Sequence, residues 1–187
     1  MPIKIFIDQG HNPQNPNAGA EGNGYREQDI TYKVGVILAE LLRQNGNFEV
    51  RLSRNSPDEI LGTSNTSSLA ARVNAANSWG ADYFISLHTN AFSSPSGRGV
   101  EAYVFSEGSP AFGLAENIVN ELSTITGFPD RGVFARPGLY VLRKTRMPST
   151  LVEMGYITNP AEAELMATEP DLIALGIYNG ILRYFGL

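Results

Sequence analysis

Two histidines and two glutamates in this sequence lie where a metal ion could be bound. His11 follows the apolar, strand-like segment Ile3–Asp8, and His88 ends a second such segment. Glu153 interrupts a third apolar segment, and Glu27 lies where the first helix is expected to begin. Open α/β sheets bind ligands at the carboxyl ends of their strands. We therefore predict that these four side chains meet at one edge of a sheet.

The types of these side chains indicate what they could do together. Two imidazoles and one carboxylate, with a fourth position left open, form the ligand set of a catalytic zinc site. A second carboxylate could then take a proton from a zinc-activated water. The chain has no cysteine, so any metal must be held by nitrogen and oxygen atoms. The pattern favours metal-assisted hydrolysis.

Each of these residues also has a structural explanation. A loop histidine such as His11 is usually only a polar side chain, and Glu27 would be stabilised by the dipole at the start of a helix. Glu153 could form a buried ion pair with Arg143 or Arg146, because a buried carboxylate without a partner is costly. Residue spacing alone also leaves three carboxylates as alternatives to Glu27, namely Glu21, Asp29 and Glu101.

The elements that must position these residues alternate along the chain. Strands are predicted from apolar and alternating runs, and helices from apolar residues at helical spacing with glycine or proline at their ends. This order predicts one α/β domain over residues 1–187, with a mostly parallel, twisted sheet covered by helices on both faces. The predicted strands are Ile3–Asp8, Phe48–Ser53, Tyr83–His88, Val100–Phe105, Leu139–Leu142 and Thr150–Met154. The predicted helices are Glu27–Asn45, a helix capped by Ser68 that runs through Ser78, Pro110–Ser123 and Asp171–Phe185, and a loop is expected from His11 to Gly24.

Composition and motifs exclude several other functions. The net charge of −5 gives no broad attraction to a phosphate backbone, which argues against a nucleic-acid-binding protein. The longest apolar runs fall far short of the ~20 residues that span a bilayer. The N-terminal segment is too short for a secretory signal. There is no Walker loop, no nucleophile elbow and no His-Glu-x-x-His motif. The segment Gly22-Asn23-Gly24-Tyr25-Arg26-Glu27 lacks the third glycine of a dinucleotide fingerprint.

Several blocks of residues, in order, resemble a known family across essentially the whole chain. They are similar to the zinc-dependent N-acetylmuramoyl-L-alanine amidases of the amidase 3 type, which trim bacterial cell walls. The departures from the family pattern are mild: Tyr156 stands where phenylalanine is common. The blocks are Ile7-Asp8-Gln9-Gly10-His11-Asn12-Pro13, then Glu27, then Ser68 to Asn77, Ser86-Leu87-His88-Thr89-Asn90-Ala91, Gly99-Val100-Glu101, and Pro148 to Asn159.

The resemblance implies a specific reaction. His11, Glu27 and His88 match the zinc ligands of the family, and Glu153 matches its catalytic glutamate, which serves as general base and then acid. The implied substrate is peptidoglycan, cut at the amide between the lactyl group of N-acetylmuramic acid and L-alanine of the stem peptide. Asn90 and Arg143 are further expected contacts to the substrate or to the reacting group.

The resemblance also carries expectations about the setting of the enzyme. We expect a monomer that acts at the bacterial cell wall, outside the membrane, without a signal peptide of its own in this chain. A phage endolysin and a sporulation or cell-separation amidase both fit. No inserted helix that would block the zinc is evident, so an open site is expected. The alternatives are a zinc exopeptidase that acts on ordinary peptides and a wall-binding module without activity.

Overall fold

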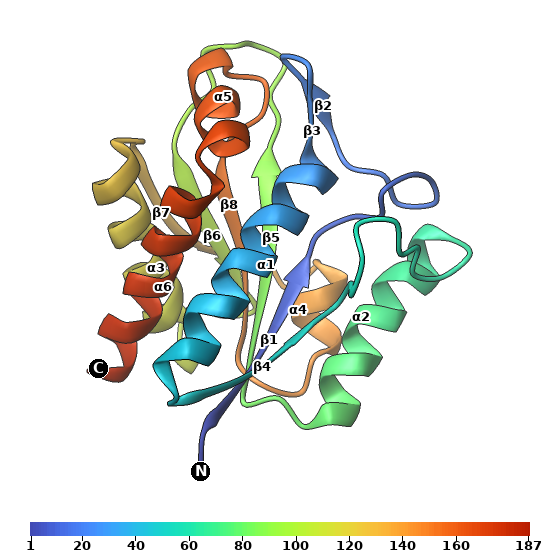
Figure 1. Cartoon of the computed structure of the whole chain (residues 1–187), viewed down its shortest axis with the longest axis vertical. Coiled ribbons are helices and arrows are strands. Elements are labelled where there is room, and N and C mark those ends of the chain that lie inside the picture. Colours follow the sequence, from blue (N-terminus) through green and yellow to red (C-terminus); the bar gives the residue numbers. More distant parts are fainter.

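Apolar strands alternate with amphipathic helices in the computed structural model, which describes residues 1–187. Eight strands and six helices form (Figure 1). The strands are β1 (Ile3–Gln9), β2 (Glu21–Gly22), β3 (Tyr25–Arg26), β4 (Phe48–Leu52), β5 (Tyr83–Asn90), β6 (Val100–Val104), β7 (Asp130–Ala135) and β8 (Ser149–Tyr156). The helices are α1 (Glu27–Asn45), α2 (Asn65–Trp79), α3 (Pro110–Thr126), α4 (Tyr140–Lys144), α5 (Pro160–Thr168) and α6 (Pro170–Phe185).

Six of the strands form one sheet in the order β4-β1-β5-β8-β6-β7. The four strands β4, β1, β5 and β8 are parallel to one another. Strand β6 runs antiparallel to β8, and β7 runs parallel to β6. The predicted single-domain α/β fold with a mostly parallel sheet is therefore confirmed, with two strands of opposite direction added at one side.

Helices cover both faces of this sheet, as predicted. Side chains alternate between the two faces along each strand, so one strand contributes to both cores. On the first face Ile5, Ile85 and Val152 pack in a large apolar cluster with residues of α1, α3 and α6. On the second face Phe6 and Phe84 pack in a smaller cluster with residues of α2 and α4. In Figure 1, α1 and α6 pass in front of the strands, the fainter α4 lies behind them, and α2 lies to their right.

The second face changes character along its strands. Under α2 and α4 it presents Phe84 and Leu151, which belong to the smaller core. Two residues further along β8, the same alternation places Glu153 on this face, and four residues along β5 it places His88. His88 and Glu153 are register partners on the adjacent strands β5 and β8. The candidate catalytic residues therefore lie beyond the apolar core, where the sheet face becomes polar.

The predicted strand Leu139–Leu142 is wrong, because the segment forms the short helix α4. Its apolar residues Val141 and Leu142 are buried in the smaller core, and a short apolar run looks the same in a strand and in a buried helical turn. Arg143 therefore does not lie on a strand that leads to β8.

The predicted start of the second helix is also wrong. Ser64 is its N-cap, and the Ser64 hydroxyl accepts a hydrogen bond from the backbone N–H of Ser67. The Ser67 hydroxyl in turn accepts a hydrogen bond from the backbone N–H of Ser64, which completes a capping box. Ser68 is buried, and its hydroxyl accepts a hydrogen bond from Asn17 instead. The cap was misplaced because the run Ser64-Asn65-Thr66-Ser67-Ser68 offers several residues that can cap a helix.

Some elements were not predicted. The hairpin β2–β3 falls mostly within the expected loop, β7 is a mixed polar strand at the sheet edge, and α5 is a short helix capped by the side chain of Asn159. Each is short or lacks clear periodicity, so neighbouring elements decide its conformation. None of the helices combines the length and the apolar character needed to cross a membrane.

Candidate metal centre

His11 is held by a turn that leaves the end of β1. Its backbone has a φ of 69°, in the left-handed region that few residues other than glycine adopt. Arg72 of α2 donates a hydrogen bond of 2.6 Å from Nη2 to the His11 carbonyl oxygen and another of 3.2 Å to Oδ1 of Asn12. The Asn12 amide in turn donates to the carbonyl oxygens of Pro16 and Leu61. These contacts fix the loop that carries His11.

Arg72 is itself held by a buried ion pair. Its Nη1 lies 2.7 Å from Oδ1 of Asp8, and both side chains are only 1% exposed. Ser86 donates a further hydrogen bond to Asp8. Burial opposes ionisation of Asp8, but the charge and the hydrogen bond of Arg72 outweigh it and lower the pKa of this carboxyl below its usual value. The ion pair therefore ties β1, which precedes His11, to α2.

Gly10 makes room for the ring of His88. A side chain at Gly10 would place its Cβ 2.5 Å from the Leu87 carbonyl oxygen and 2.6 Å from the His88 ring. Because real Cβ atoms do not approach so closely, only glycine lets β1 and the imidazole pack in this way. The segment after β1 therefore supplies His11 itself and, through Gly10, the space for the ring of His88.

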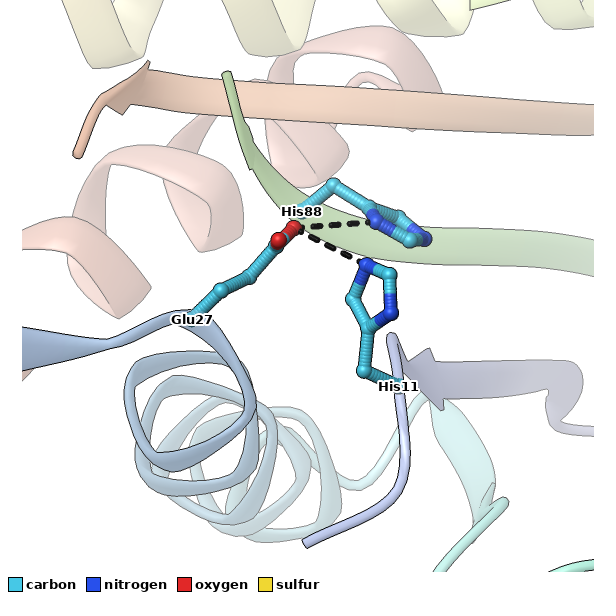
Figure 2. Close-up of side chains that lie close together, drawn as sticks. All are labelled: His11, Glu27 and His88. Atoms are coloured by element: carbon cyan, nitrogen blue, oxygen red, sulfur yellow. Dashed lines mark hydrogen bonds and ion pairs between the residues drawn. The ribbon is translucent and has the colours of Figure 1, made fainter. Parts of the chain in front are cut away.

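Glu27, the first residue of α1, joins the two histidines. Its Oε1 atom lies 3.3 Å from Nε2 of His11 and 3.2 Å from Nδ1 of His88 (Figure 2). The backbone N–H groups of Thr89 and Ala20 donate to the two carboxylate oxygens. Burial alone would raise the pKa of Glu27, but the contacts with both histidines outweigh it and hold the pKa far below its usual value.

The three side chains form a donor set that fits a divalent metal ion. One ligand atom from each of His11, Glu27 and His88 lies within 4.8 Å of the other two. The short distances between the carboxylate and each ring nitrogen are hydrogen bonds only if both nitrogens carry protons, and a bound metal would replace these protons. The histidine side chains are 20% and 18% exposed, so the cluster is accessible from solvent.

Comparison with known proteins places the chain in a family. Residues 5–183 match the Amidase_3 family, described as N-acetylmuramoyl-L-alanine amidase. The chain belongs to this family. The resemblance inferred from the sequence blocks is therefore confirmed, and the protein is an N-acetylmuramoyl-L-alanine amidase, an enzyme that acts on peptidoglycan.

Curated relatives of this amidase are similar over almost the whole chain. The amidase CwlM of Bacillus licheniformis is 38% identical over 189 residues, which cover 99% of this chain and 70% of the relative. A sporulation-specific amidase of Bacillus subtilis is 35% identical, with 99% and 69% covered. The endolysin of Bacillus phage SPP1 is 32% identical, with 98% and 66% covered.

Solved structures have the same fold. An N-acetylmuramoyl-L-alanine amidase from Clostridium difficile 630 superposes with a TM-score of 0.87 at 28% identity, with 99% of this chain and 97% of that chain covered. The CwlD amidase from Clostridioides difficile, in complex with the GerS lipoprotein, gives a TM-score of 0.89 at 27% identity, with 98% of each chain covered.

Glu153 of the amidase lies beside the cluster without a partner. It forms no ion pair with Arg143 or Arg146, and its Oε2 atom is buried and accepts no hydrogen bond. Burial, together with the negative charges of Glu27 and Glu101, raises its pKa to about 8. An unpartnered carboxyl that holds a proton near neutral pH is suited to proton transfer.

The other carboxylates that could have replaced Glu27 as a metal ligand lie elsewhere in the amidase. Glu21 and Asp29 lie near the guanidinium of Arg26 and are mostly exposed. Glu101 is buried, but its carboxylate accepts hydrogen bonds from Asn90, Tyr103 and Arg131. Of these four carboxylates, only Glu27 joins the histidine cluster.

The two expected substrate contacts lie in different places. The Asn90 amide donates to Glu101, and its oxygen accepts from the backbone of Ala91, so the side chain is held within the protein near the site. Arg143 is exposed and lines a hollow with Pro148 and Ser149, at the start of β8, four residues before Glu153. The geometry does not bring Arg143 to the cluster, and its contact with substrate stays a prediction.

Sequence reasoning gave no role to the residues that support the ligands. Asp8 and Arg72 lie within the sequence blocks that resemble the family, and in the fold they together anchor the backbone of His11. One signal was available, because Asp8 directly follows the apolar run from Ile5 to Ile7, and a carboxylate at such a buried position needs a partner. Its partner lies 64 residues away in the chain, and only the fold identifies it.

Proposed function

We propose that this amidase hydrolyses the amide between the lactyl group of N-acetylmuramic acid and L-alanine, with zinc held by His11, Glu27 and His88. The observation that carries the proposal is the convergence of these three side chains beside the unpartnered Glu153. Two ring nitrogens and one carboxylate oxygen, accessible from solvent, match the donor set of a catalytic zinc site. Bound zinc lowers the pKa of a water ligand to roughly 7 and polarises a carbonyl oxygen.

Glu153 is proposed to move the protons of this reaction. Its Oε2 atom accepts no hydrogen bond within the protein. The positive charge of a bound zinc ion would lower the pKa of this carboxyl and favour its ionised form, which can take a proton from the attacking water. The same carboxyl then gives a proton to the nitrogen of L-alanine as the amide breaks. Because Glu153 is the register partner of His88, it lies next to the ligand cluster without being part of it.

The proposal includes the place where the enzyme works. Peptidoglycan lies outside the cytoplasmic membrane, so the site of action is the cell wall. We propose that one copy of the chain is sufficient, because the three ligands and Glu153 all come from the same chain. The exposure of both histidines supports a site that needs no activator to open it.

The test is digestion of purified peptidoglycan, with the severed bond identified by mass spectrometry. Stem peptides that begin with free L-alanine should be released, and a chelator should stop their release. Added zinc should restore it. Cuts elsewhere in the stem would indicate a zinc exopeptidase or endopeptidase on the same scaffold. Binding to the wall without any cleavage would indicate a wall-binding module.

A further inference from the structure

Positive charge is concentrated in one stretch of the sequence, from β7 to β8. The whole chain is acidic, with 14 Lys and Arg against 19 Asp and Glu. From Arg131 to Val152, however, the sequence has no Asp or Glu and has five cationic residues: Arg131, Arg136, Arg143, Lys144 and Arg146. The first two come from β7 and the residue that follows it, two strands away from β8.

Arg131 is held in place by contacts along its whole length. Its Nε donates a 2.8 Å hydrogen bond to Glu101, and its guanidinium lies 5.5 Å from the centre of the Tyr156 ring. The aliphatic part packs where Gly99 has no side chain, since a Cβ there would lie 2.9 Å from the Cγ and Cδ atoms of Arg131. Glu101 is fixed in turn by Asn90 and Tyr103.

A β-bulge directs this side chain. Val100 pairs with Asp130 and Glu101 pairs with Gly132, so Arg131 between them has no register partner in β6. Bulges often re-aim a side chain beside an active site. Here the side chain reaches Glu101, which is the register partner of Glu153 on the neighbouring strand. The Arg131 guanidinium and the Glu153 side chain therefore lie on the same face of the sheet.

Most of the hydrogen-bonding capacity of Arg131 remains unused. Nε is occupied by Glu101, Nη1 makes only a 3.5 Å contact with the Arg98 carbonyl oxygen, and Nη2 has no partner in the protein. The side chain is 45% exposed. A guanidinium that is fixed at Nε and open at its terminal nitrogens is prepared for a carboxylate, which it can bind through two parallel hydrogen bonds.

The spacing of the strands suggests which carboxylate of the substrate Arg131 could bind. Two strand spacings place β7 about 10 Å from β8, and the Arg131 side chain reaches back toward β6. An extended peptide advances about 3.3–3.6 Å per residue. A carboxylate on the second residue after the cleaved amide therefore lies within reach of Arg131 when that amide is beside Glu153.

We propose that Arg131, positioned by Glu101, Tyr156 and Gly99, binds the free α-carboxylate of the second, acidic residue of the stem peptide. This specificity rests on the proposed function, since it requires the amide before L-alanine to lie at Glu153. Arg131 thus selects stems in which that carboxylate is free over stems in which it is amidated. Glu101 is a positioning residue, because it acts on the substrate through Arg131.

The test compares two matched substrates with the zinc-loaded protein. They are muramoyl tripeptides that differ only in the second residue, which carries either a free α-carboxylate or an α-carboxamide. The natural protein should cleave the carboxylate substrate with at least a tenfold higher kcat/KM. Arg131→Gln should lose this preference by slowing cleavage of the carboxylate substrate, and it should change cleavage of the carboxamide substrate less than threefold.

Controls separate this proposal from a general effect of charge and from the proposed function. Arg146→Gln removes one exposed positive charge in the same cationic segment and should keep the preference. Arg131→Lys keeps the charge but not the paired hydrogen bonds, and should keep only part of the preference. Dissociation constants of both substrates, measured by calorimetry in a Glu153→Gln background, should show the same order without turnover.

The outcomes distinguish the two claims. Equal cleavage of both substrates by the natural protein would overturn the role of Arg131 and leave the amidase assignment intact. Loss of the preference in Arg146→Gln as well as in Arg131→Gln would show a diffuse charge effect and would also overturn it. Failure to cleave either substrate, with binding still selective for the carboxylate through Arg131, would count against the proposed reaction and support the binding site.

Discussion

At the scale of single residues, Glu153 and His88 are neighbours with different proposed roles. Replacing Glu153 with glutamine should leave zinc binding close to that of the natural protein, because Glu153 is outside the ligand cluster. Activity should fall by about 10²–10⁴-fold, the usual contribution of a general acid–base group. His88→Ala should lose both zinc and activity. Mass spectrometry measures the metal content, and peptidoglycan digestion measures the activity. If Glu153→Gln kept most of its activity, Glu153 would not be the general base.

The raised pKa of Glu153 also predicts how stability depends on pH. In the metal-free protein its pKa rises from 4.5 to about 8, so the folded state holds this proton more tightly than the unfolded chain. The associated stability is fully present below pH 4.5 and is lost as the pH rises through about 8. Glutamine does not ionise, so Glu153→Gln should be more stable than the natural protein at pH 9 by about 1–3 kcal/mol, after allowance for partial exposure.

The measurement is denaturant unfolding of both proteins in the presence of a chelator. The difference in unfolding free energy should be larger at pH 9 than at pH 5. A difference that does not change with pH would mean that Glu153 titrates near its ordinary value.

At the scale of elements, one buried ion pair ties the strand before His11 to a helix. Arg72 of α2 bonds Asp8 of β1 and the carbonyl oxygen of His11. Arg72→Met should destabilise the protein by about 3–5 kcal/mol, because it leaves the Asp8 charge buried without its partner. It should also weaken metal binding, since the backbone of His11 loses its anchor. Urea unfolding and a zinc titration measure the two losses.

A matched control uses an exposed ion pair of equal length. Arg183 lies 2.7 Å from Glu121, and its side chain is 61% exposed. Arg183→Met should cost less than about 1 kcal/mol and should leave metal binding unchanged, because solvent screens the pair. Equal losses in the two variants would contradict the anchoring role assigned to Arg72.

At the scale of the whole molecule, the proposed metal site joins segments that are far apart in the chain. His11 follows β1, Glu27 begins α1 and His88 lies in β5, so a ligand bound by all three stabilises the folded state over the unfolded one. Free zinc at 100 times its dissociation constant adds about 2.7 kcal/mol. For a protein of this size that raises Tm by about 5–10 °C.

Thermal unfolding with zinc and with a chelator checks this shift. The shift should disappear in Glu27→Gln, which keeps a similar shape but loses the charge of the ligand. An equal shift in the natural protein and in Glu27→Gln would show that zinc binds elsewhere.

The alternation of apolar and polar residues determined much of this fold and site in advance. Consecutive apolar residues such as Ile5, Phe6 and Ile7 indicate a strand buried on both faces, and the glycine after Trp79 correctly marked a helix end. His11 and His88 stood out because each comes at the end of a strand-like segment, whereas Glu27 was distinguished from other carboxylates by the resemblance to a known family. These patterns involve residues close together in the chain, so they can be recognised from the sequence without knowledge of the fold.

Only the tertiary structure decided how distant segments meet. Leu139–Leu142 became a helix because it packs in the core under α2, and β7 formed because β6 offered an edge. The choice of Glu27 over Glu101 in the cluster also depends on partners far away in the chain, since Arg131 and Tyr103 occupy Glu101. Sequence patterns report the local conformation of each residue, whereas burial and partner choice depend on contacts between residues that only the folded chain brings together.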